Sequence, residues 1–142
     1  MSAHRPVGPL EAAYVEQLAL CEDLEAVADT LPHPFDPARL ADIAHRTEAV
    51  LERLQTAERT ELFPLLLLRG DRGAVERREK AHNADAAAAA EVAEALSAQL
   101  RGTVHLSPDA QGYLLRSYFE GIRRHIEAEA EWLRLFAQHR KV

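Results

Sequence analysis

The sequence contains a single cysteine, Cys21, so the chain cannot form an internal disulfide bond. A reduced, cytoplasmic environment is therefore expected, with Cys21 as a small core residue. The longest apolar run is the leucine tract at 65–68, far short of the roughly 18 residues that a membrane span requires. Residues 1–9 hold no long apolar stretch, so no signal peptide is predicted.

The chain also lacks an excess of positive charge. Its 17 basic residues stand against 23 acidic ones, which gives a net charge of −6. An acidic chain does not carry the electrostatic footprint of a nucleic-acid-binding protein. We interpret the arginine pairs Arg77-Arg78 and Arg123-Arg124 as solvated helix faces. No Gly-rich phosphate loop, zinc-type cysteine pair or Ser/His/Asp arrangement is present. Neither a nucleic-acid partner nor a membrane partner is expected.

Strand signals are absent too, because no segment alternates and β-branched residues are few. Proline and glycine gather at 31–37, 69–73 and around 102–108, where they mark turns. The spacing predicts helices over 9–31, 38–68, 73–101 and 108–138, with Asp36 capping the second. Pro64 should remove one backbone hydrogen bond and kink the last turns of that helix. Short connections predict an all-α, up-down-up-down antiparallel four-helix bundle as one domain over 1–142.

Apolar residues recur at steps of three and four, but the inward-facing stripes also carry ionisable residues. Three pairs stand out: Glu58 with Glu61, Glu79 with His82, and His125 with Glu129. At 1.5 Å per residue, the three pairs fall within roughly 10 Å of one another along the bundle axis. A buried charge needs a partner or a metal ion. Three helices are therefore expected to direct ligand-type side chains at one layer.

The spacing within the pairs suits metal ligation. His125 and Glu129 are four residues apart, which places them on one helix face. Glu79 and His82 have the i, i+3 spacing of di-iron bundles, although a surface role for Glu79 is equally open. Imidazole mixed with carboxylate suits iron, manganese or zinc. The same layer could instead be a hydrogen-bonded network in which His82 and His125 pair with glutamates.

At these residues the chain resembles the hemerythrin family, specifically bacterial HHE cation-binding domains. The resemblance covers nearly the whole chain. It is strongest at 119–129 and at 58–66, where an acidic stretch precedes Leu62-Phe63-Pro64, and His82 with Asp85 is similar to the family's third-helix ligand region. It implies an up-down bundle around a non-haem di-iron centre, with a role in oxygen binding, oxygen or redox sensing, or iron handling.

The resemblance implies ligands at four positions: Glu58, His82, His125 and Glu129. The chain departs from the family pattern at two others. The family has histidine one turn before Glu58, where this chain has Leu54, and near the start of the first helix, where it has Tyr14. A second third-helix histidine, found in some members, corresponds to Ala86. Because two imidazoles are missing, we do not expect reversible oxygen binding.

Three hypotheses follow, in this order. The first is a non-enzymatic metal-binding protein with an atypical, carboxylate-rich centre for iron, possibly di-iron, or another divalent metal. Its candidate ligands are Glu58, His82, His125, Glu129, Glu61 and Tyr14. The second is a metal-free bundle with a structural or protein-interaction role. It could be a homodimer through the apolar segment at 62–68. The third is a di-metal oxidase or peroxidase.

For two of these candidate ligands, the sequence leaves a second interpretation open. Tyr14 could ligate ferric iron as a phenolate, or be a core aromatic with a hydrogen-bonded hydroxyl. Glu61 could instead pair with an arginine or lysine of a neighbouring helix.

Overall fold

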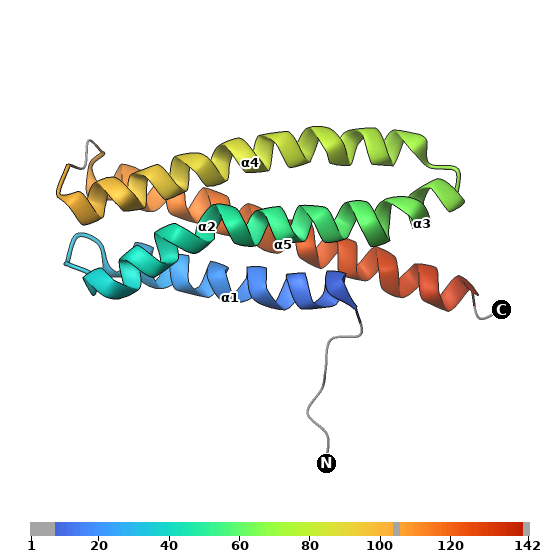
Figure 1. Ribbon diagram of the computed structural model, residues 1–142, viewed down its shortest axis with the longest axis horizontal. Helices are drawn as coiled ribbons and strands as arrows, with labels where there is room; N and C mark the ends of the chain where they lie inside the picture. The colour runs from blue at the N-terminus through green and yellow to red at the C-terminus, as the bar shows by residue number, and fades with distance from the viewer. Residues whose placement is uncertain (1–7, 104–105, 141–142) are drawn as a thin grey trace, which may run out of the picture.

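Four helical rods run side by side in the computed structural model, which describes residues 8–103 and 106–140 (Figure 1). Their segments are α1 (Pro9–Thr30), α2 (Pro37–Ala57), the π-helical turn η1 (Glu58–Leu62), α3 (Phe63–Leu68), α4 (Arg72–Arg101) and α5 (Pro108–Arg140). α2, η1 and α3 follow one another without a break and form one rod. The described residues contain no strand. The predicted all-α bundle is confirmed, and each helix end lies within two residues of its predicted position.

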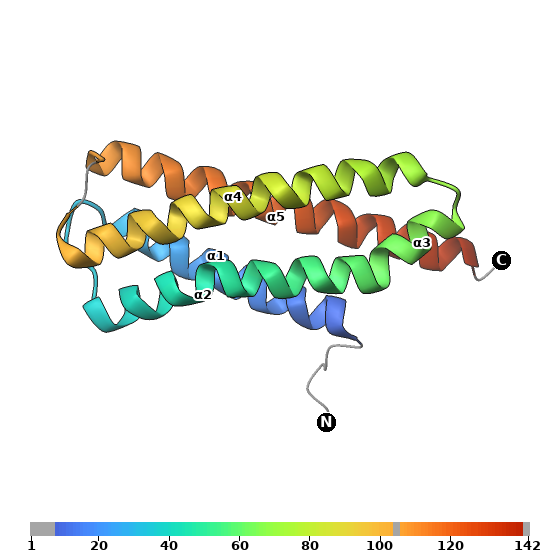
Figure 2. The ribbon, with the colours of Figure 1, turned by 45° about the horizontal axis from the view of Figure 1, so that its top comes forward.

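Each rod packs against two others. α2 lies against α1 and α4, while α5 lies against α1 and α4 from the other side. The turn between α3 and α4 is at the opposite end of the bundle from the connection between α1 and α2 (Figure 1). A second view shows the same near-parallel arrangement (Figure 2). No helix within the described residues is both long and apolar enough to cross a membrane.

Polar side chains and glycines set the helix ends. The Asp36 carboxylate accepts a hydrogen bond from the Arg39 N–H at 3.2 Å, which confirms the predicted cap of α2. The Asp71 carboxylate accepts one from the Ala74 N–H at the start of α4, at 2.9 Å. Gly102 ends α4 with φ of 74°, in the left-handed region that glycine adopts without strain. These caps explain why the predicted ends are accurate.

The effect of Pro64 reaches further back than its own turn. Pro64 has no N–H, and its ring would collide with the carbonyl of residue 60 in a regular α-helix. The backbone widens just before it, and the Phe63 N–H bonds to the carbonyl of Glu58, five residues earlier. This π-helical turn is η1. Such turns are rare and are found frequently at functional sites.

The core is apolar over most of its length and polar in one layer. Its fully buried apolar side chains come from every rod and include Leu20, Leu24, Leu54, Leu96, Leu115 and Phe119. Cys21 is buried among them, as expected. Glu58, His82 and Glu129 are also buried. Glu58 opens η1, about three helical turns from the α3–α4 turn, so the polar layer lies in that half of the bundle.

Candidate metal centre

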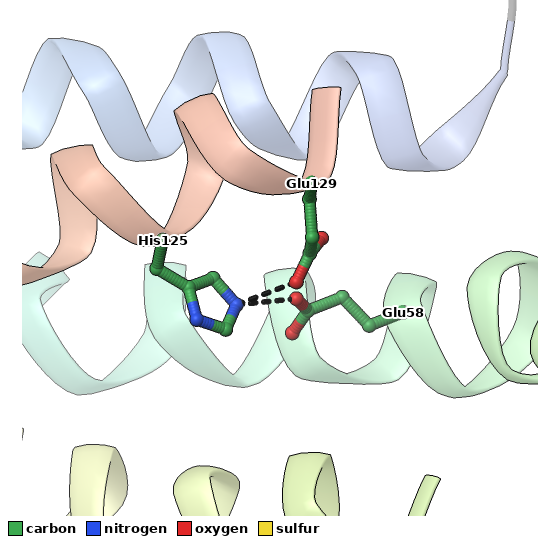
Figure 3. Close-up of side chains that lie close together, drawn as sticks. All are labelled: Glu58, His125 and Glu129. Carbon is green, nitrogen blue, oxygen red and sulfur yellow. Dashed lines mark hydrogen bonds and ion pairs between the residues drawn. The ribbon is translucent and has the colours of Figure 1, made fainter. Parts of the chain in front are cut away.

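Three side chains from two rods converge in the polar layer. Nε2 of His125 lies 2.8 Å from Oε2 of Glu58 and 2.6 Å from Oε2 of Glu129 (Figure 3). One ligand atom from each of the three residues lies within 4.8 Å of the other two. His125 and Glu129 share a face of α5 because they are one turn apart. Glu58 reaches them from η1, at the opening of the wide turn.

His82 brings α4 into the same layer. Its Nε2 lies 2.9 Å from Oε1 of Glu58, so the Glu58 carboxylate connects the two imidazoles, one through each oxygen. The Gln55 side-chain amide donates to the His82 carbonyl at 2.9 Å, and the Phe63 ring stacks on the imidazole at 5.4 Å. His82 is therefore held from both its backbone and its ring.

The tautomer of His82 follows from its other neighbour. Nη1 of Arg59 lies 3.4 Å from Nδ1 of His82. A guanidinium has no acceptor, so Nδ1 accepts in this contact and the ring proton belongs on Nε2, where it donates to Glu58. To ligate a cation through Nε2, His82 would have to release both its hydrogen bond to Glu58 and the proton on that nitrogen.

Arg78 also enters the layer, which corrects its interpretation as part of a solvated face. Its guanidinium Nη1 donates to Oε2 of Glu129 and lies 2.8 Å from Nε2 of His125. The side chain is only 24% exposed. Arg78 precedes His82 by four residues and so shares its helix face. The four-residue spacing from His82 could have predicted an inward position for Arg78. Because all the residues at 76–80 are charged, Arg78 does not stand out from its neighbours in the sequence.

On α4, the positions that contact the layer are His82 and the position one turn nearer the α3–α4 turn. Ala86, four residues after His82, is exposed, and so is Glu79. Neither is brought into the layer. The second inward position of α4 next to His82 is therefore Arg78. Asp85, one turn after His82, is half-buried, and its burial raises the pKa of its carboxyl.

Tyr14 and Glu61 are the two remaining candidate ligands, and only Tyr14 contacts the polar layer. The Tyr14 hydroxyl donates to Oε1 of Glu129 at 2.6 Å, and burial together with this carboxylate raises the pKa of Tyr14 far above its ordinary value. Tyr14 is thus a protonated phenol at the edge of the layer. Glu61 points elsewhere, because its Oε2 accepts from the Leu10 N–H at 2.7 Å and caps α1. The wide turn of η1 shifts Glu61 away from the Glu58 face.

Electrostatics couple the three converging residues. Burial alone would raise the pKa of Glu58, but hydrogen bonds from His125 and His82 bring it well below its usual range. Burial would lower the pKa of His125, but hydrogen bonds to Glu129 and Glu58 raise it to about 9. Burial and the nearby Glu58 raise the pKa of Glu129, against the effect of His125. Without a metal, the layer thus holds an imidazolium and the Arg78 guanidinium beside its carboxylates.

A surface pocket of about 440 Å³ opens onto the layer between α3, α4 and α5. Glu129 and Arg78 line its inner wall, and the exposed side chains of Arg77 and Asp71 also border it. Leucines of the α3 rod and Trp132 of α5 form apolar walls. Solvent in the pocket reaches Arg78, which is 24% exposed, whereas the carboxylate of Glu129 behind it is fully buried.

The donor set fits a metal ion. Two buried carboxylates and an imidazole present their ligand atoms to one point, with a second imidazole adjacent. Buried carboxylates of this kind need positive charge nearby. Oxygen and imidazole nitrogen together suit iron, manganese and zinc.

Comparison with known protein families gives one finding. The sequence model described as the hemerythrin HHE cation binding domain matches residues 15–134. Glu58, His82, His125 and Glu129 all lie inside the matched range, and Tyr14 lies just before it. Comparison with curated proteins and with solved structures gives no match.

Proposed function

The chain belongs to the hemerythrin HHE cation-binding family, and on this premise we propose that it binds a metal ion at Glu58, His125 and Glu129. The observation that carries the proposal is the convergence of three ligand atoms in a buried layer of the bundle. His82 is the fourth ligand we propose, through Nε2, once that nitrogen has released Glu58 and its proton. The family suggests metal binding, and its typical metal is iron.

The other two candidates have supporting roles in this proposal. Tyr14 holds Glu129 through its hydroxyl, and Glu61 fixes the start of α1 beside the rod that carries Glu58. A bound iron, manganese or zinc ion would supply positive charge and, for iron or manganese, a redox couple. The function we propose is non-enzymatic: metal binding with a role in oxygen sensing, redox sensing or iron handling.

A second candidate function is a metal-free interaction domain. Arg78 and His125 already place positive charge against Glu58 and Glu129, so the layer is a connected hydrogen-bonded network without any ion. Leu67 and Leu68 are exposed at the end of α3, where a second copy of the chain could cover them. These observations favour a dimeric bundle if no metal binds.

Metal analysis distinguishes the two candidates. The chain would be purified without a metal-affinity step or chelator, analysed for metals, and then titrated with ferrous iron under anaerobic conditions. We expect near-stoichiometric metal in the natural protein and its loss in Glu58→Gln and His125→Ala. His45→Ala, on an exposed face of α2, is the matched control and should retain the metal. A natural protein that neither carries nor takes up metal would favour the interaction domain.

A further inference from the structure

Arg78 touches two of the three proposed metal ligands. Its Nη1 donates to Oε2 of Glu129 and lies 2.8 Å from Nε2 and 3.0 Å from Nδ1 of His125. These include Nε2 of His125, which faces Glu58, and Oε2 of Glu129, which faces His125. The guanidinium therefore binds one ligand atom that a metal ion would need, Oε2 of Glu129, and occupies the space beside another, Nε2 of His125.

A metal ion and the guanidinium would repel each other at these distances. A metal bound to Nε2 of His125 lies about 2.1 Å from it. Since Nη1 of Arg78 is 2.8 Å from the same atom, the two cations would be no more than about 5 Å apart. In a buried layer, where solvent screens little, like charges so close are strongly unfavourable. One of them has to leave.

Arg78 is the cation that can move away, because a solvent-filled pocket lies beside it. It comes from one side of α4, is already 24% exposed, and lines the pocket of about 440 Å³ that opens to solvent. The pocket also carries the Asp71 carboxylate, which provides negative charge outside the layer. His125 and Glu129, by contrast, are fixed on one face of α5, and Glu129 is held by Tyr14.

We propose that Arg78 is an internal cation that competes with the metal ion for Glu129 and for the space beside His125. This inference rests on the proposed function. In the metal-free protein Arg78 neutralises the layer; when a metal ion enters, Arg78 withdraws into the pocket between α3, α4 and α5. The arginine thereby weakens metal binding and keeps it reversible. It sets the affinity of the centre without being one of its ligands.

The direct test compares Arg78→Leu with Arg77→Leu. Leucine brings no ligand atom, and Arg77 borders the same pocket with its guanidinium toward Asp71, at 3.9 Å. Affinity for zinc and, anaerobically, for ferrous iron would be measured by competition with a coloured chelator. We expect Arg78→Leu to bind about tenfold to hundredfold more tightly, the range set by one charge-assisted hydrogen bond that the metal no longer displaces. Arg77→Leu should match the natural protein.

The outcomes separate the two proposals. If the natural protein binds metal and Arg78→Leu binds equally or more weakly, Arg78 supports the ligands and the inference is overturned. If neither binds any metal, the proposed function fails and the competition fails with it.

A second measurement uses the natural protein alone, should Arg78→Leu not fold. Phenylglyoxal modifies accessible arginines, and peptide mass spectrometry can follow Arg78 and Arg77 separately. Metal loading should accelerate labelling of Arg78 severalfold and leave Arg77 unchanged. Unchanged or slower labelling of Arg78 in metal-loaded protein would show that it stays in the layer, against the inference.

Discussion

The hydroxyl of Tyr14 on α1 donates to Oε1 of Glu129 on α5 over 2.6 Å, although 115 residues separate them in the chain. Both side chains are buried. The other oxygen of Glu129 faces Arg78 and His125, so the carboxylate is engaged on both sides. The first helix therefore takes part in the polar layer even though its histidine is missing.

Replacing Tyr14 with phenylalanine should destabilise the metal-free protein. The change removes the donor to a buried carboxylate, and hydrogen bonds to charged groups contribute about 1.5–3 kcal/mol. We expect the free energy of unfolding, measured in urea with chelator present, to fall by that amount. Tyr113→Phe is the matched control, since Tyr113 is 76% exposed. Equal stability of the two variants would mean that the Tyr14 hydroxyl contributes nothing.

Glu61→Ala should affect stability but not metal content. Its carboxylate accepts from the Leu10 N–H, and loss of a helix cap costs about 1 kcal/mol. Urea unfolding and metal analysis of the same preparation check both halves of the prediction, with Glu120→Ala on an exposed face of α5 as the control. If Glu61→Ala lost its metal while remaining folded, Glu61 would return to the ligand set.

The stability of the metal-free protein should fall as the pH rises above neutrality. The pKa of His125 is about 9 in the folded state, against an ordinary value of 6.5 in the unfolded chain. Its contribution is therefore complete below about pH 6.5 and is lost as the pH passes 9. At 1.36 kcal/mol per pKa unit, the difference between 6.5 and about 9 corresponds to a loss of about 3 kcal/mol.

Urea unfolding with chelator at pH 6, 7.5 and 9 measures this slope, and His125→Gln should abolish it. Metal-loaded protein should show the opposite trend between pH 6 and 7.5, since a ligating imidazole must be neutral. A metal-free protein whose stability stays constant up to pH 9 would contradict the paired imidazolium.

Oxygen should not bind reversibly to the ferrous protein. Leu54 is buried one turn before Glu58 and offers no electron pair, and Tyr14 is engaged with Glu129. We expect no reversible change in the visible spectrum on oxygenation and deoxygenation. The double variant Tyr14→His and Leu54→His should move toward such a change, because both positions are buried in the core and Leu54 precedes Glu58 by one helical turn. A reversible change in the natural protein would show that the ligands are misassigned.

The sequence predicts the helices and much of the layer because local patterns determine both. Proline, glycine and aspartate mark the helix ends, and their effects are confined to neighbouring residues. His125 and Glu129 meet because they are four apart on one helix. Glu58 and His82 follow from counting residues from the α3–α4 turn. Such arithmetic works for straight antiparallel rods of known rise.

Counting residues along regular helices does not predict two features of the layer, for physical reasons. Arg78 has a long side chain, and whether its guanidinium points outward or inward depends on Glu129, which lies 51 residues away. Glu61 shares the Glu58 face only if the helix stays regular, but Pro64 induces the wide turn that rotates it toward α1. Periodicity assumes an ideal helix and therefore misplaces the residues next to a π-helical turn.

The wide turn at η1 also bears on the length of the chain. A turn closed by a bond five residues back accommodates one residue more than an α-helical turn. Deleting one residue within this turn should therefore restore regular winding while α3 keeps its present orientation, and Leu66, now buried, should stay buried. Deleting one residue from the regular part of α2 would instead rotate the segments on either side by about 100° relative to each other. The rod can thus lose a residue at 58–62 without the change of register that the same loss would cause in α2.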